Sequence, residues 1–258
     1  MADAVTYTRS ELISSVVMDD GKFNVFSIPM LHAVHEAFDQ AEQDGTVVLL
    51  KGRPGCFTAD FDLKTLSGPP QDVLTLLRLG ASLAERILSF PAPVVIACTG
   101  HAFPAGAFLL MAADARVGAD GPFRLGLKEV RIGLTLPWFA IVLARHRLAP
   151  AQFDHAAVTG DMFDPETARE AGPLDSVVPP AELHARAHSM AEDLASIDRS
   201  AHAATKLRVR KPVLDELRSA METELVESAP ETENGNWTPR HIRHMINMWT
   251  NPRRSWRR

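Results

Sequence analysis

The chain has 258 residues, of which 46 % are hydrophobic and 23 % are charged, so it can bury a full globular core. Its net charge of −5 argues against nonspecific nucleic-acid binding, and no apolar run reaches the roughly 18 residues that a membrane helix requires. It has only two cysteines, and its N-terminus lacks the pattern of a signal peptide. We therefore expect a cytoplasmic protein without a disulfide framework, with no nucleic-acid partner and no membrane association.

Short β-rich runs alternate with helical stretches over the first half of the chain. The expected elements, in chain order, are a strand at Leu12–Met18, a helix at Ile28–Asp44, a strand at Val47–Lys51, a helix at Val73–Ser89, a strand at Val94–Cys98, a helix at Phe103–Ala113 and a strand at Ala115–Ala119. Strands separated by helices of this length need crossover connections, so the pattern predicts a largely parallel sheet.

After Leu134 the pattern becomes mostly helical. Helices are expected within Pro137–Gly160, Pro165–Gly172 and Ala181–Ile197, and the polar segment Ser228–Asn236 is expected to link the last helix to the body. We therefore divide the chain into a core, residues 1–199, and a helical C-terminal region, residues 200–258. The arginines near the C-terminus indicate a solvated basic tail or a contact with a partner subunit.

Two segments that follow predicted strands have the composition of ligand-binding loops. The first, Gly55–Leu63, reads GCFTADFDL, and turn-forming residues at a strand end allow backbone N–H groups to face a ligand. The second, Thr99–Asp114, combines small residues with Pro104 at a helix start, where free N–H groups and the helix dipole favour an anion. An ordinary turn and close helix–sheet packing are the respective alternatives.

In order along the chain, these loops and a third segment resemble the signatures of the crotonase (enoyl-CoA hydratase/isomerase) superfamily over roughly residues 5–210. The residues that match the pattern F-x-A-G-x-D-[LI] are Phe57, Ala59, Asp62 and Leu63. Gly100–Gly106 loosely matches G-x-a-x-G-G-G, and Leu125–Pro137 is similar to the glutamate-bearing segment. The resemblance implies an α/β fold, a crotonase-like spiral of repeated ββα units, with a helical C-terminal oligomerisation region that forms a homotrimer or hexamer.

The same resemblance implies the catalytic groups. The backbone N–H groups of Phe61 and Ala105 are expected to form an oxyanion hole for a thioester enolate. Glu129 is the expected acid/base, and apolar neighbours should raise its pKa toward the range that suits reversible proton transfer. Taken alone, the local sequence would instead favour a surface ion pair of Glu129 with Lys128 or Arg131.

The substrate, an acyl-CoA thioester, is expected to contact both loops, and no cofactor is implied. The expected binding residues are Ala59, Asp60, Phe61, Asp62, Leu63, Phe108 and Trp138. Asp60 stands where the family has Gly; because Asp tolerates the left-handed helical conformation, a structural accommodation is favoured over a catalytic role. Asp62 is expected to hold the loop, and Trp138 to line the acyl pocket, with core packing as the alternative.

Three further sets of polar residues are considered. His101 is expected to be packed or hydrogen-bonded rather than catalytic. Lys206 and Arg208 match positions that lie near the CoA phosphates in relatives, although a solvated face is favoured. The histidine pairs at helical spacing have no third ligand in a recognisable motif, so we expect no metal site.

The type of reaction depends on Phe108, which occupies the position of the first glutamate in hydratases. A single carboxylate can move one proton along an allyl system, but it cannot easily polarise water as well. We therefore expect a Δ3,Δ2-enoyl-CoA isomerase of fatty-acid metabolism. The alternatives are an enoyl-CoA hydratase, a CoA-independent C–C hydrolase and a non-catalytic acyl-CoA-binding protein.

Overall fold

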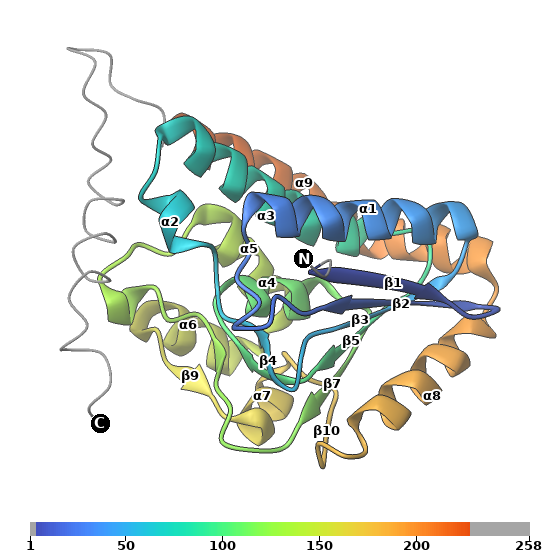
Figure 1. The fold of residues 1–258 in the computed structure, drawn as a ribbon. Helices are drawn as coiled ribbons and strands as arrows, with labels where there is room; N and C mark the ends of the chain where they lie inside the picture. Colours follow the sequence, from blue (N-terminus) through green and yellow to red (C-terminus); the bar gives the residue numbers. More distant parts are fainter. Residues whose placement is uncertain (1–3, 228–258) are drawn as a thin grey trace.

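The computed structural model describes residues 4–227, whose strands form two sheets (Figure 1). The larger sheet has the order β1 (Val5–Arg9), β2 (Ile13–Met18), β3 (Val47–Lys51), β5 (Val94–Cys98), β7 (Ala115–Ala119) and β10 (Ser176–Val178). Strands β1 and β2 pair antiparallel, and every other pairing in this sheet is parallel. The largely parallel sheet expected from the sequence is therefore confirmed.

The smaller sheet has the order β4 (Gly55–Thr58), β6 (Gly100–Ala102), β8 (Leu125–Gly126) and β9 (Met162–Phe163). Along the chain, each of its first three strands comes directly after a strand of the larger sheet: β4 follows β3, β6 follows β5, and β8 follows β7. Helices α2 (Leu63–Leu66) and α3 (Pro70–Ser89) separate the first two of these pairs, and α4 (Ala105–Ala112) separates the next two. This alternation forms the expected spiral of ββα units.

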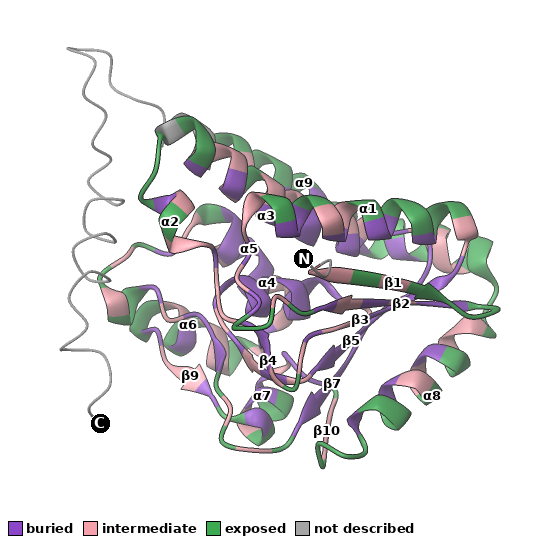
Figure 2. Ribbon diagram, viewed as in Figure 1, coloured by how far each residue is buried: buried purple, intermediate pink, exposed green. Residues whose placement is uncertain are grey.

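The central strands β3, β5 and β7 of the larger sheet are buried on both faces, whereas β1 at its edge is largely exposed (Figure 2). Val48 and Leu50 of β3 belong to the main core, with residues of α1 (Ile28–Asp44) and α3. Val47 and Leu49 of the same strand face the opposite side, where they pack with α8 (Leu183–Ala195). Because successive side chains of a strand point to opposite faces, burial on both sides explains the unbroken apolar run at Val47–Leu50.

The helical second half consists of α5 (Trp138–Arg147), α6 (Pro150–Thr159), α7 (Pro165–Ala171), α8 and α9 (Arg199–Glu227). The stretch expected at Pro137–Gly160 is thus two helices, because Pro150 begins a new one. None of the helices between residues 4 and 227 is both long and apolar enough to cross a membrane. The predicted link at Ser228–Asn236 lies outside the described residues, and the division after residue 199 stays a prediction.

A buried ion cluster joins α9 to the body of the protein. The Asp114 carboxylate pairs with Lys206 Nζ at 2.7 Å and with an Arg210 guanidinium nitrogen at 2.9 Å. The same carboxylate accepts a hydrogen bond from the Val94 amide at 2.7 Å. Only 3 % of the Lys206 side chain is exposed, so both expectations for it, a phosphate contact and a solvated face, are wrong.

Candidate active site

The two predicted loops meet because β4 and β6 are neighbouring parallel strands. Gly55 lies opposite Gly100 in this pairing, and a Cβ atom added at Gly100 would lie 2.1 Å from the Gly55 backbone. At the other end of the strands, a Cβ atom added at Gly106 would come within 2.8 Å of Thr58 Cγ2. Glycine therefore permits the close approach that brings the first loop next to the start of α4.

Hydrogen bonds fix the backbone on both sides of Phe61. The Phe26 amide donates to the Asp60 carbonyl oxygen at 2.8 Å, and the Asp62 amide donates to the Phe26 carbonyl oxygen at 2.9 Å. The Phe61 ring is buried against Gly80, where a Cβ atom would lie 2.4 Å away. Both ends of the residue are therefore held, and the direction of its N–H group is defined.

The amides of Phe61 and Ala105 converge on one group, the carboxylate of Asp60. The Phe61 amide donates to Asp60 Oδ1 at 2.8 Å, and the Ala105 amide lies near enough to this carboxylate to favour its charged form. Ala105 is the first residue of α4, where its N–H group has no partner within the helix. The structure thus brings the two predicted donors together around a single anion.

Asp60 has an unusual backbone conformation and an unusual electrostatic setting. Its φ of 117° lies beyond the left-handed helical region that Asp tolerates, in a range that favours Gly, so that part of the expected accommodation is wrong. Burial raises the pKa of Asp60 to about 7, although Lys128 and the amides of Phe61 and Ala105 act to lower it. Lys128 Nζ lies 3.8 Å from Asp60 Oδ2.

Glu129 is buried, with 5 % of its surface exposed, and its Oε2 atom has no hydrogen-bond partner among the described residues. Burial raises the pKa of Glu129 to about 8, and the nearby Asp60 carboxylate raises it further. The alternative of a surface ion pair is wrong, because Arg131 pairs with Asp161 at 2.7 Å and Lys128 lies beside Asp60. The expected rise in pKa is confirmed, whereas the catalytic role stays a prediction.

The neighbours of Glu129 in sequence contribute less to its burial than expected. Leu127 is buried, but Val130 is 40 % exposed and begins a short 3₁₀ helix that ends at Ile132. These neighbours therefore do not by themselves account for the burial of Glu129.

Phe108 of α4 packs against Phe139 of α5. Phe108 is 3 % exposed and meets Phe139 edge to face, with ring centroids 5.3 Å apart. Trp138, the first residue of α5, is 48 % exposed, so the core-packing alternative is wrong for it and holds only for Phe139. The position of Phe108 thus holds a ring in a dry environment.

The remaining predicted residues serve local structure. The Asp62 carboxylate caps α2, accepting hydrogen bonds from Thr65 N at 3.0 Å and Thr65 Oγ1 at 2.7 Å. Ala59 donates its amide proton to the Phe23 carbonyl oxygen at 3.0 Å, and Leu63 begins α2 with its side chain against the main core.

His101 has the packed role that the sequence predicted. Its Nδ1 atom accepts a hydrogen bond from the Arg124 amide at 3.1 Å, and its ring packs edge to face on Phe103 and Phe123. The described residues contain no cluster of three or more histidine, cysteine, aspartate or glutamate side chains that could hold a metal ion.

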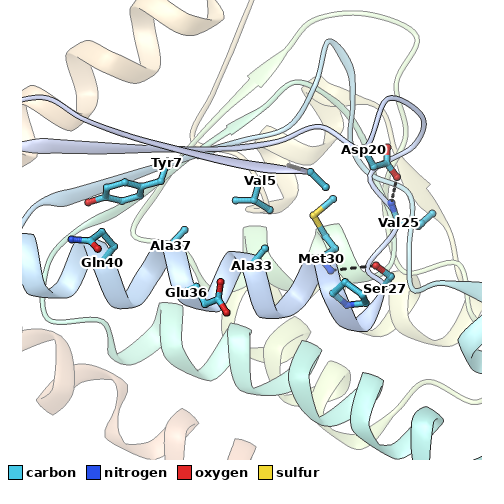
Figure 3. A pocket seen from close by; sticks show the side chains of 12 residues that line it. Val5, Tyr7, Asp20, Val25, Ser27, Met30, Ala33, Glu36, Ala37 and Gln40 are labelled. Carbon is cyan, nitrogen blue, oxygen red and sulfur yellow. Dashed lines mark hydrogen bonds between the residues drawn. The ribbon is translucent and has the colours of Figure 1, made fainter. Parts of the chain in front are cut away.

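A separate groove with a volume of about 630 Å³ lies between β1 and α1 (Figure 3). Tyr7, Ala33, Glu36 and Gln40 are among the residues that line it. None of the lining residues belongs to the predicted site, so this groove is a different surface feature.

Comparison with known proteins agrees with this arrangement. The family model for enoyl-CoA hydratase/isomerase matches residues 8–234. The chain belongs to this family. Its two loops and its glutamate segment are therefore features of a crotonase-superfamily protein.

Three solved structures illustrate the similarity. An enoyl-CoA hydratase/isomerase family protein from Pseudomonas syringae is 40 % identical, with a TM-score of 0.86 over 88 % of this chain and 99 % of that one. An enoyl-CoA hydratase from Mycobacterium ulcerans is 39 % identical, with a TM-score of 0.85 over 88 % and 100 % of the two chains. An enoyl-CoA isomerase from Mycobacterium tuberculosis is 38 % identical, with a TM-score of 0.84 over 88 % and 100 %. Names for both reactions thus occur at nearly equal identity, and they do not decide between them.

Proposed function

We propose that this family member is a Δ3,Δ2-enoyl-CoA isomerase that acts on an acyl-CoA thioester without a cofactor. The observation that carries this proposal is that one site contains both a buried carboxyl group, that of Glu129, and two convergent backbone amides, those of Phe61 and Ala105. Glu129 is buried, and its pKa is raised to about 8. The amides of Phe61 and Ala105 meet on one side of the site and already hold a carboxylate.

In the proposed reaction, ionised Glu129 removes a proton from C2 of a 3-enoyl-CoA. The negative charge then moves onto the thioester oxygen, which the amides of Phe61 and Ala105 stabilise as hydrogen-bond donors. Loss of one such donor typically costs on the order of 10²–10³ in rate. Glu129 returns the same proton to C4, so the double bond moves from C3 to C2 and the atoms balance.

Phe108 supports isomerisation over hydration. Hydration needs a group that accepts a proton from water, and the buried Phe108 ring against Phe139 offers none. A ring in that position also excludes water from the acyl chain. Isomerisation needs one base and no water, so it fits a site in which Phe108 stands at this position.

Hydration remains a second candidate because of Asp60. Its raised pKa and its electrostatic effect on Glu129 favour it as a second carboxyl group for the activation of water. This reading requires Asp60 to take the part of the glutamate that Phe108 replaces. The two reactions differ in the substrate that is consumed.

The test is a comparison of two substrates with the wild-type enzyme. We expect faster consumption of but-3-enoyl-CoA by isomerisation than of but-2-enoyl-CoA by hydration, with a ratio of specificity constants above about 100. Equal or faster hydration would reject the isomerase and favour the hydratase. The absence of both reactions, together with measurable binding of both thioesters, would leave an acyl-CoA-binding protein.

A substitution sharpens the comparison. Phe108→Glu restores a carboxyl group at the hydratase position and should raise hydration relative to isomerisation. Because the position is 3 % exposed, the new carboxyl group costs several kcal/mol of stability, so Phe108→Gln serves as a matched polar control. A gain in hydration in both variants would point to simple water entry instead of proton transfer.

A further inference from the structure

The Asp60 carboxylate occupies the position where the proposed function needs the substrate oxygen. Phe61 N donates to its Oδ1 atom at 2.8 Å, and the Ala105 amide approaches the same carboxylate and favours its charged form. Each of these amides has one proton to donate, so a second acceptor cannot be bound at full strength while the first remains. In the described conformation, the hole therefore already holds an anion that belongs to the protein.

We propose that Asp60 is an internal competitor for the oxyanion hole, and that an acyl-CoA thioester binds productively only after the Asp60 carboxyl group has left the amides of Phe61 and Ala105. This inference rests on the proposed function for the identity of the incoming ligand. It makes Asp60 a residue that determines substrate affinity, by occupying the site rather than by taking part in proton transfer.

Lys128 offers the displaced carboxyl group a second partner. Its Nζ atom lies 3.8 Å from Asp60 Oδ2 and 4.1 Å from the centre of the Phe103 ring, and its side chain is 12 % exposed. The separation from Asp60 exceeds that of a direct hydrogen bond, so a closer ion pair becomes available when Asp60 turns away from the amides. Lys128 is thus a positioning residue for the open form, in which the Asp60 carboxyl group has left the amides of Phe61 and Ala105.

The competition depends on the charge of Asp60. Ionised carboxylates accept stronger hydrogen bonds from amides than neutral carboxyl groups do, so a protonated Asp60 leaves the hole more easily. Burial brings the pKa of Asp60 to about 7, with Lys128 and the two amides opposing this rise. Release is therefore favoured as the pH falls through about 7.

Glu129 has the opposite requirement, because it must be ionised to remove a proton. An ionised Asp60 raises the pKa of Glu129, so the two carboxyl groups disfavour each other's charge. Removal of the Asp60 carboxyl group should both free the hole and allow Glu129 to ionise at lower pH.

The test compares Asp60→Gly and Asp60→Asn with the wild type. Gly suits the φ of 117° and removes the competitor, whereas Asn keeps the shape and an acceptor oxygen without the charge. Asp154→Asn on the exposed face of α6 is a control that changes the net charge equally. Acetoacetyl-CoA binding is measured by calorimetry, and isomerisation of but-3-enoyl-CoA is followed as a function of pH.

In the closed form, the Asp60 carboxyl group occupies the oxyanion hole. If this form outweighs the open form by about ten to one, the apparent affinity of the wild type for acetoacetyl-CoA is reduced about tenfold. We expect acetoacetyl-CoA to bind about tenfold more tightly to Asp60→Gly, with Asp60→Asn intermediate and Asp154→Asn unchanged. The Michaelis constant for but-3-enoyl-CoA should fall in the same order, and the rise of activity with pH should begin at lower pH in Asp60→Gly.

Unchanged affinity in both Asp60 variants would overturn the inference. A loss of turnover at unchanged affinity would also overturn it, since it would assign Asp60 to proton transfer.

A second measurement does not depend on CoA. In the wild type without ligand, the amide proton resonances of Phe61 and Ala105 should shift together with the ionisation of Asp60, and this common titration should vanish in Asp60→Asn. If no variant binds a CoA ester while the titration is present, the proposed function fails and the contact stands. If the titration is absent, the carboxyl group does not occupy the hole and the inference is wrong.

Discussion

Replacement of Glu129 by Gln should make the protein more stable while removing its proton-transfer group. Glu129 is 5 % exposed, and burial raises its pKa from the ordinary value of 4.5 to about 8. Between these two pH values the folded protein binds more protons than the unfolded chain. Stability contributed by this group therefore falls as the pH rises from about 4.5 to about 8.

The size of this effect follows from the two pKa values. At about 1.36 kcal/mol per pH unit, the preference of buried Glu129 for its neutral form costs less than about 1 kcal/mol at pH 5, about 3 kcal/mol at pH 7 and about 5 kcal/mol at pH 9. Glutamine has no charge to bury, so Glu129→Gln avoids this cost. At about 2–4 °C per kcal/mol, the melting temperature of the variant should exceed that of the wild type by about 6–12 °C at pH 7.

The assay is thermal unfolding of both proteins at several pH values, with Glu11→Gln at an exposed position as the control. The advantage of Glu129→Gln should grow from pH 5 to about pH 8 and level off by pH 9, and the control should show no such trend. The isomerase activity of Glu129→Gln should meanwhile fall by about 10²–10⁴-fold. A difference in melting temperature that stays constant with pH would refute the reasoning, because it would mean that the carboxyl group is not desolvated.

Four other outcomes are expected. Lys206→Met should lower the free energy of unfolding by about 3 kcal/mol without changing CoA affinity, measured by urea denaturation and calorimetry, because it breaks a buried pair with Asp114. Gly106→Ala should reduce turnover at least tenfold, measured with but-3-enoyl-CoA, because its Cβ atom would meet Thr58 at 2.8 Å. Asp60→Gly should raise the midpoint of urea unfolding by relieving about 1 kcal/mol of backbone strain. Sedimentation should show an oligomer instead of a 28.3 kDa monomer, and Val209→Asp on α9, where Val209 is 70 % exposed, should weaken it.

Local signals in the sequence were sufficient for the long elements. Helix α1 has the predicted bounds because Ser27 caps its first turn and Gly45 ends it in a left-handed conformation. Strands such as β3 and β5 are apolar throughout, since both of their faces are buried. Strands β4 and β6 were missed because they have four and three residues and begin with Gly, a composition that also suits turns.

The candidate site could be predicted only in outline. The motifs located the loops of Phe61 and Ala105 and the segment of Glu129, and they showed that Asp60 departs from the family pattern. They could not show that the Asp60 side chain turns back onto the amides, since that depends on its φ and on contacts across two loops. The pairing of Lys206 with Asp114, 92 residues apart in the chain, likewise has no local signal.

The Asp114 carboxylate also has a consequence for how the chain can be shortened. It binds the first residue of β5 through the Val94 amide, and it binds α9 through Lys206 and Arg210. A fragment that stopped before Arg199 would leave this carboxylate without either cation at the edge of the main core, directly after α4. We therefore expect such a fragment to fold poorly and the minimal autonomous unit to extend through α9, even though the residues of the candidate site all precede it.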